Sequence, residues 1–284
     1  MGLQPKDFVV FGACVGVFLS LLYTGRHYYS AVFRSGIGWR PSPSADRSAV
    51  WGFRLCAAML LLFVLQLARV GIDWQLAVGY ASVLIVVYVV SGRLMAEGGL
   101  FHIKIASFPC AMLWGLLGAR ALGFRTLLLL EMVTMVLFID PRETLLPFMV
   151  NANKLLAGNR VAIGRVSVLA ASAVILGILV ALPVTLYIQY SVPVATQGDQ
   201  WSFKHVPRMP FENAVAVKQK FEALGILEEA EACRGWGRFA AMEPVRPCLW
   251  AFAAGLVLVF IAAACRMRFP WWPIHPPIVV VWAK

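Results

Sequence analysis

The chain has 284 residues, of which 61% are hydrophobic and only 14% are charged. Soluble domains usually carry about 25% charged residues, so a water-soluble catalytic domain is excluded as the bulk of this protein. The net charge of +11 does not indicate nucleic-acid binding, because Lys and Arg gather in the cytoplasmic loops of membrane proteins. We therefore expect an all-α, polytopic bundle of transmembrane helices in a lipid bilayer, with no nucleic-acid partner.

Apolar stretches long enough for spans follow one another along the chain. A bilayer core about 30 Å thick needs roughly 20 apolar residues per helix. On this basis we expect about seven spans: Phe8–Tyr23, Val50–Ala68, Leu76–Gly92, Ile105–Gly123, Thr126–Ile139, Val166–Tyr190 and Leu249–Cys265. Pro109 and Gly118 interrupt the fourth stretch, so a broken or re-entrant segment near 91–123 is an alternative to a clean crossing.

Basic residues predict how the spans are oriented. Alternate loops carry twelve and four Lys or Arg residues, and the richer set is expected in the cytoplasm. The amino terminus then lies outside. The cytoplasmic set is Arg26, Arg34, Arg40, Arg47, Arg93, Lys104, Arg142, Lys154, Arg160, Arg165, Arg266 and Arg268, and the outside set is Lys6, Arg69, Arg120 and Arg125.

The remaining sequence divides into three regions. Residues 1–190 hold spans one to six, with an interfacial helix near 141–157. Residues 191–248 form an extramembrane segment outside, and 249–284 hold the last span and a Trp/Pro-rich end. Within 191–248, Val217, Phe221, Leu224 and Leu227 recur at helical spacing and predict an amphipathic helix. It either caps a transport path or packs on the membrane surface or a neighbour.

Ionisable residues inside spans are costly and tend to face other protein or a water-filled cavity. Glu131 lies in the middle of the fifth stretch and Arg120 in the fourth. An ion pair of Glu131 with Arg120, or with Arg54 of the second stretch, would neutralise both charges. Glu131 is either such a structural partner or a contact for a substrate or coupled ion.

The stretch from Ser91 to Gly99 places Arg93 and Glu97 four residues apart and then breaks with Gly98 and Gly99. Transporters use broken helices to expose backbone groups to a substrate. The alternative is an ordinary cytoplasmic turn with a local Arg93–Glu97 pair. The candidate residues of a substrate or ion path are Arg93, Glu97, Gly98, Gly99, Glu131 and Arg120.

Motifs of soluble enzymes and of metal sites are absent from the sequence. There is no phosphate-binding glycine loop, no nucleophile elbow and no zinc-protease signature, and the four histidines and six cysteines are not at ligand spacing. We expect no enzyme activity, no metal and no cofactor. Cys233 and Cys248 share one loop and could pair if that loop faces an oxidising compartment.

Three short stretches carry a family resemblance: Thr24–His27, Arg93–Gly99 and Arg268–Pro276. They resemble an uncharacterised group of bacterial membrane proteins related to oligopeptide transporters, of which this chain matches only the carboxyl-terminal half. The resemblance implies a bundle with broken helices in the bacterial cytoplasmic (inner) membrane, and secondary transport of a peptide-like or small organic solute.

A half-bundle would leave polar groups without partners, so we expect association with other membrane chains, as a homo-oligomer or in a larger complex. Two functions follow. The first is a transporter-like protein that acts within an assembly. The second is a non-catalytic accessory or scaffolding subunit of a larger membrane complex.

Overall fold

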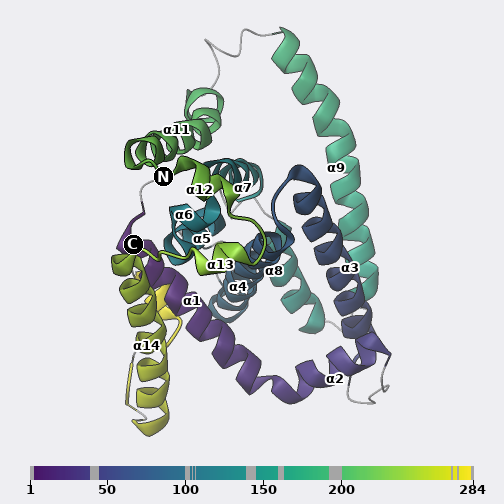
Figure 1. Cartoon of the computed structure of the whole chain (residues 1–284). Coiled ribbons are helices and arrows are strands. Elements are labelled where there is room, and N and C mark those ends of the chain that lie inside the picture. Colours follow the sequence, from purple (N-terminus) through teal and green to yellow (C-terminus); the bar gives the residue numbers. More distant parts are fainter. Residues whose placement is uncertain are drawn as a thin grey trace.

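The computed structural model describes residues 3–38, 45–99, 103, 105, 107–138, 145–158, 163–191, 200–269, 271–273 and 275–282. These residues form helices and no strand (Figure 1). The helices are α1 (Pro5–Thr24), α2 (Arg26–Ile37), α3 (Arg47–Val70), α4 (Trp74–Gly98), α5 (Pro109–Leu117), α6 (Ala119–Leu122), α7 (Phe124–Leu137), α8 (Leu145–Gly158), α9 (Ile163–Ser191), η2 (Trp201–His205, a π-helix), α11 (Val206–Leu224), α12 (Leu227–Ala232), α13 (Gly237–Ala240), α14 (Arg246–Arg268) and α15 (Ile278–Trp282).

Five helices in the described part of the chain are long and apolar enough to cross a membrane: α1, α3, α4, α9 and α14. They coincide with five of the seven stretches expected from hydropathy. The chain is thus an all-helical protein of the membrane class. The expected count of seven spans stays a prediction, because the other two stretches fold differently.

The fourth and fifth apolar stretches form a bent pair of short helices. α5 has 9 residues and α7 has 14, or about 14 Å and 21 Å of helix at 1.5 Å per residue. Each is shorter than a bilayer core of about 30 Å. Pro109 begins α5, and Gly118 and Gly123, both with positive φ, bracket the single turn of α6. A broken segment, one of the two expected alternatives, is what these residues form.

α1 and α14 pack closely and run in the same direction. A Cβ on Gly12 would lie 2.0 Å from the Phe252 carbonyl oxygen, and one on Gly16 would lie 3.1 Å from Val259 Cβ. From the other side, a Cβ on Gly255 would lie 2.0 Å from the Val9 carbonyl oxygen. Small residues spaced four apart allow helix backbones to approach in this way. The charge-based orientation also requires α1 and α14 to cross in the same direction.

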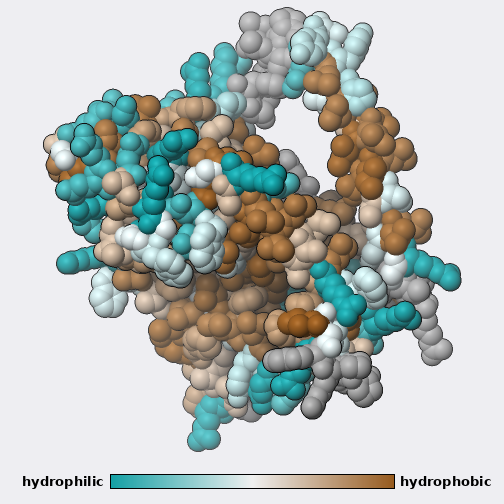
Figure 2. All heavy atoms as spheres, turned by 45° about the vertical axis from the view of Figure 1, so that its right-hand side comes forward, coloured by the Kyte–Doolittle hydropathy of each residue, from teal (hydrophilic) through white to brown (hydrophobic). Residues whose placement is uncertain are grey.

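Segments that the charge count assigns to opposite sides lie at opposite ends of α4. At its beginning, Asp73 bonds Arg238 of the 191–248 segment, which in turn bonds α6 and α7. At its last turn, Lys154 of α8 donates to the Ala96 carbonyl, and Glu97 and His275 line a common pocket. Figure 2 shows apolar side chains across the middle of the molecule, with polar side chains toward the two ends.

α11 covers the stretch in which an amphipathic helix is expected. Its buried residues, Pro210, Ala214, Val217 and Phe221, recur every three or four positions, which places them on one face. α11 and α7 lie side by side, at the top of Figure 1. Leu224 remains 60% exposed, and Leu227 begins the next helix, α12. The apolar stripe thus packs on a neighbouring helix of the same chain.

Two of the long helices are mostly exposed in the described part of the chain, although α3 contacts α2 and α4, and α9 contacts α8. No residue is buried in the apolar window of α3 or of α9. α9 runs along the outside of the molecule, at the right of Figure 1. Both helices therefore present their side chains to whatever surrounds the protein.

Several predictions fall outside the described residues. They concern the basic residues Arg40, Lys104, Arg142 and Arg160, and the first part of the interfacial helix, 141–144; its described part is α8. Ile139, Pro270 and Ile274 also lie outside. Cys233 and Cys248 are described and both are free thiols. The Cys233 Sγ–H donates instead to the Glu229 carbonyl at 3.3 Å, so no disulfide joins the two.

Candidate functional site

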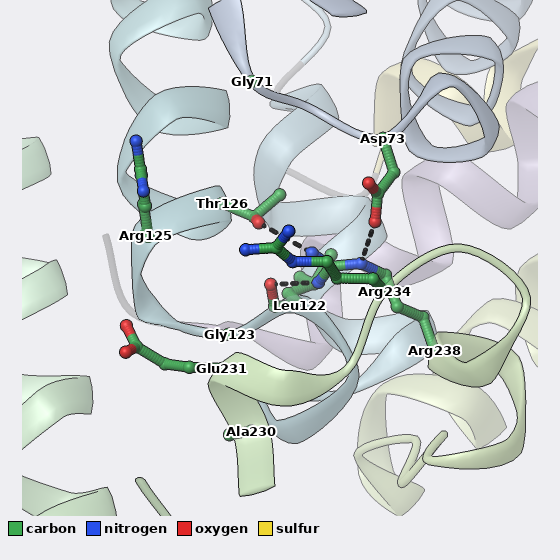
Figure 3. Close-up of a pocket in the computed structure, with 10 residues that line it drawn as sticks. All are labelled: Gly71, Asp73, Leu122, Gly123, Arg125, Thr126, Ala230, Glu231, Arg234 and Arg238. Carbon is green, nitrogen blue, oxygen red and sulfur yellow. Dashed lines mark hydrogen bonds and ion pairs between the residues drawn. The ribbon is translucent and has the colours of Figure 1, made fainter. Parts of the chain in front are cut away.

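One polar site of the protein centres on Arg238, which is only 8% exposed. Its Nε donates to Asp73 Oδ2 at 2.5 Å. Its Nη1 donates to the carbonyl oxygens of Ala121 and Leu122 at 2.8 and 2.5 Å, and its Nη2 donates to Thr126 Oγ1 at 3.2 Å (Figure 3). One guanidinium thereby joins the α3–α4 turn, the α6–α7 break and α13, in which Arg238 itself lies.

The local sequence explains why the oxygens around Arg238 are free to accept its hydrogen bonds. Ala121 and Leu122 end the single turn of α6 before Gly123, so their carbonyls have no continuing helix to accept from. Asp73 precedes α4 but does not cap it with its side chain. Its Oδ2 also accepts the Gly235 backbone N–H at 3.1 Å, and Gly235 reaches it with a positive φ of 57°.

Hydrogen bonds and nearby positive charges lower the pKa of Asp73. Burial of this carboxyl on its own would raise the pKa, but the hydrogen bonds from Arg238 and Gly235 and the positive charges of Arg238 and Arg234 outweigh it. The pKa of Asp73 therefore lies below its ordinary value, and the Asp73–Arg238 pair is ionised at neutral pH.

Beside this pair lies a pocket of about 330 Å³. It is lined by polar and small residues of the three joined segments: Gly71, Asp73, Leu122, Gly123, Arg125, Thr126, Ala230, Glu231, Arg234 and Arg238. In Figure 3, Arg125 and Glu231 lie on one side of the pocket and Arg234 reaches toward them from the other. Within the described residues, the side chains of Arg125, Arg234 and Glu231 have no hydrogen-bond or ion-pair partner.

Glu131, a predicted site residue, is buried in α7 and only 1% exposed. Both of its carboxylate oxygens accept from Asn213 Nδ2 of α11, at 3.3 and 3.2 Å. One turn further on, the Thr134 hydroxyl donates to the Leu130 carbonyl at 2.8 Å. The Tyr80 hydroxyl of α4, 3.0 Å away, therefore donates to Thr134, whose single proton is already used. Polar groups of α4, α7 and α11 thus meet inside the helical core.

Arg120 does not pair with Glu131, so this prediction is wrong. Its Nη2 contacts Glu229 Oε2 at 2.8 Å and its Nη1 contacts Glu243 Oε1 at 3.1 Å. Arg120 lies in the single turn α6, which points it toward the 226–245 segment rather than toward the face of α7 that carries Glu131. Arg54, the other predicted partner, donates to the carbonyls of Gly36 and Ser35 at the end of α2.

Arg93 and Glu97 form an i,i+4 ion pair at 2.5 Å, with side chains 52% and 40% exposed. α4 continues through both residues and Gly98, and ends at Gly99, whose φ of 61° is left-handed. The helix therefore ends here with an ordinary glycine cap, and the break in the bundle lies further on, at Gly118 and Gly123 between α5 and α7. Glu97 and Gly98 also line a second pocket of about 310 Å³ with His275, Ile278 and Val281.

Sequence reasoning missed Asp73, Arg125, Arg234 and Arg238. Their signals were present but weak on their own: an aspartate in a three-residue turn between two spans, and two arginines four residues apart, of which Arg234 precedes α13 and Arg238 lies in it. Asp73 and Arg238 are 165 positions apart in sequence, so no local pattern links them. In the described part of the chain, no three His, Cys, Asp or Glu side chains come together as metal ligands do.

In the part of the chain that the structure describes, these features define a helical protein with five helices able to cross a membrane and a broken pair of shorter helices beside them. At one end of α4 lies the Arg238 clasp, by which we mean Arg238 and its acceptors Asp73, Ala121, Leu122 and Thr126. No curated protein and no solved structure matches the chain. A family of unknown function, DUF6785, matches residues 1–281. The chain belongs to this family.

Proposed function

We propose that this protein is a transporter-like membrane protein that carries a peptide-like or small organic solute by secondary transport and acts within an assembly. The observation that carries the proposal is the broken pair α5–α7. Each of the two helices is too short to span, and α5 packs against α4 and α14, which are long enough to do so. Irregular backbone at membrane depth is tolerated where protein or a water-filled cavity surrounds it.

A buried hydroxyl before α5 supports this proposal. Of the described residues between 103 and 108, Ile103, Ile105 and Ser107 are buried and Phe108 is half-buried. The Ser107 hydroxyl is buried and has no hydrogen-bond partner among the described residues. An unpaired buried hydroxyl costs about 1–3 kcal/mol, a cost that a passing polar solute or water would remove.

The candidate path residues are spread over the length of the bundle. Arg120 lies in α6, at the end of the bundle where α4 begins. Glu131 lies in α7, and Glu97 lies in the last turn of α4. Under this proposal Glu131 contacts the solute or a coupled proton, and Arg93, Glu97, Gly98 and Gly99 border the cytoplasmic mouth. The protein then lies in the bacterial cytoplasmic membrane with its amino terminus outside.

Uptake by reconstituted protein tests the proposal. Proteoliposomes with an imposed proton gradient are supplied with a labelled dipeptide, and Glu131→Gln is compared with Glu228→Gln. Glu228 is an exposed residue of α12. We expect at least about tenfold slower uptake with Glu131→Gln, because the Gln keeps the shape but neither carries charge nor exchanges a proton, and unchanged uptake with Glu228→Gln. Equal uptake by the wild-type protein, Glu131→Gln and Glu97→Gln would remove both carboxylates from the mechanism.

The second candidate function is a non-catalytic accessory or scaffolding subunit. The apolar window of α9 favours it: none of its residues is buried by the described part of this chain, so this face is available to helices of another chain. Purification in a gentle detergent separates the two functions. Unrelated subunits at fixed stoichiometry favour scaffolding, whereas a homo-oligomer of this chain favours the transporter.

A further inference from the structure

We infer that the pocket beside the Arg238–Asp73 pair binds a singly charged oxyanion, a carboxylate or phosphate group, through Arg125 and Arg234. The inference does not rest on transport, because it concerns recognition at one end of the bundle. Three features of the pocket carry it: its unpaired guanidinium groups, its charge balance and the helix terminus that opens into it.

Guanidinium groups without partners are the first feature. Arg238 donates to Asp73, to two carbonyls and to Thr126. Its guanidinium is therefore held in place and forms part of the pocket wall. Arg125 and Arg234 line the same pocket but have no hydrogen bond or ion pair among the described residues. A guanidinium presents its N–H groups in a fork that matches two oxygens of a carboxylate or phosphate.

Charge balance, the second feature, sets the sign and size of the ligand charge. Asp73 neutralises Arg238, and its lowered pKa keeps it ionised. The pocket is then left with two positive charges, on Arg125 and Arg234, and one negative charge, on Glu231. The surplus is one positive charge, which one negative charge on a ligand would balance.

The beginning of α7 is the third feature. Gly123 precedes this helix of 14 residues, and Gly123, Arg125 and Thr126 line the pocket. The first N–H groups of a helix have no acceptor within it, and the helix dipole adds partial positive charge at this end. Backbone donors and two guanidinium groups therefore lie around one cavity, whose volume of about 330 Å³ is at the small end of ligand pockets.

A free solute and a lipid headgroup share this oxyanion chemistry, so the experiment has an arm for each. Full-length protein in neutral detergent is titrated by calorimetry with propionate and with inorganic phosphate at about pH 6, where each probe carries mainly one negative charge. In the second arm, the protein is placed in nanodiscs of phosphatidylglycerol or of phosphatidylcholine, and retained lipids are counted by native mass spectrometry. Saturable binding of either soluble probe assigns the site to a solute. Retention of phosphatidylglycerol alone assigns it to a headgroup.

Variants test the residues. Arg125→Gln and Arg234→Gln should each weaken binding in the responding arm by at least about tenfold, since a hydrogen bond to a charged group contributes enough for this. Lys220→Gln, an exposed residue of α11, is the matched control and should bind as the wild-type protein does. Glu231→Gln should tighten binding by up to about fivefold, because it removes a repelling charge.

The inference is overturned if no probe and no lipid binds, or if both arginine variants bind as tightly as the wild-type protein while their unfolding midpoints are unchanged. Weaker binding by Glu231→Gln would also overturn the assignment to a plain oxyanion. Neither outcome depends on whether the protein transports a solute, so the two proposals fail separately.

Discussion

At the scale of single residues, Arg238 determines how three distant segments meet. All four of its acceptors lie outside its own segment: Asp73, Ala121, Leu122 and Thr126. Lysine has a single ammonium in place of the planar fork and cannot reach all four. Arg238→Lys should therefore destabilise the protein by about 2–3 kcal/mol, because a partly buried carboxylate and carbonyls lose donors.

Thermal unfolding of the detergent-solubilised protein measures this effect as a lowered midpoint. Lys220→Ala is the control, because Lys220 is an exposed cation of α11. A midpoint for Arg238→Lys equal to that of the wild-type protein would show that the clasp does not stabilise the fold.

The pKa of Asp73 gives this clasp a defined pH dependence. Its folded pKa lies below the ordinary value, so the stability it contributes is fully present above about pH 4, the unfolded value. That stability is lost as the pH falls through the lower, folded pKa. The difference in unfolding midpoint between wild-type protein and Asp73→Asn should be constant from pH 8 to pH 5 and shrink below about pH 4. A difference that grows toward acid pH contradicts the assigned ion pair.

At the scale of elements, the contact of α1 with α14 depends on glycines. A Cβ at Gly12 or Gly255 would overlap a backbone oxygen at 2.0 Å, and neither backbone can move away without separating the helices. Gly12→Ala and Gly255→Ala should each lower the unfolding midpoint, with a cost of about 1–3 kcal/mol as for other overpacked sites.

Gly52→Ala in α3 is the matched control, because nothing lies within 4 Å of its Cβ position. It should be neutral or slightly stabilising, since alanine is the better helix former. If the two interface variants unfold at the same temperature as Gly52→Ala, the close approach of α1 and α14 is wrong.

Hydropathy located the long helices but could not resolve the short ones. A stretch of about 20 apolar residues has one stable solution in lipid, so α1, α3, α4, α9 and α14 follow from composition. Residues 105–139 are just as apolar, yet Pro109, Gly118 and Gly123 divide them, and an averaged window does not register single residues. The Arg238 site escaped prediction because its parts are joined only by tertiary contact. The Gly12–Gly16 spacing was visible, but it marks a helix contact without naming the partner.

At the scale of the whole molecule, the charge bias and the parallel course of α1 and α14 predict one orientation. Single cysteines placed in a cysteine-free variant test it with a membrane-impermeant maleimide. Lys220→Cys in α11 should react in intact spheroplasts, and His27→Cys in α2 should react only after the membrane is opened. Both positions are exposed. The reverse pattern would mean that the orientation is inverted. Reaction of both cysteines in intact cells would mean that the two positions lie on the same side, with an even number of crossings between them.

The pairing of α1 with α14 also sets an order of events during synthesis. The glycine face of α1 leaves the ribosome more than two hundred residues before Gly255, which closes against it. Asp73 is likewise synthesised before Arg238, its ion-pair partner. A nascent chain that has inserted only its first helices therefore still exposes Gly12 and Gly16 and carries an Asp73 carboxylate without its arginine.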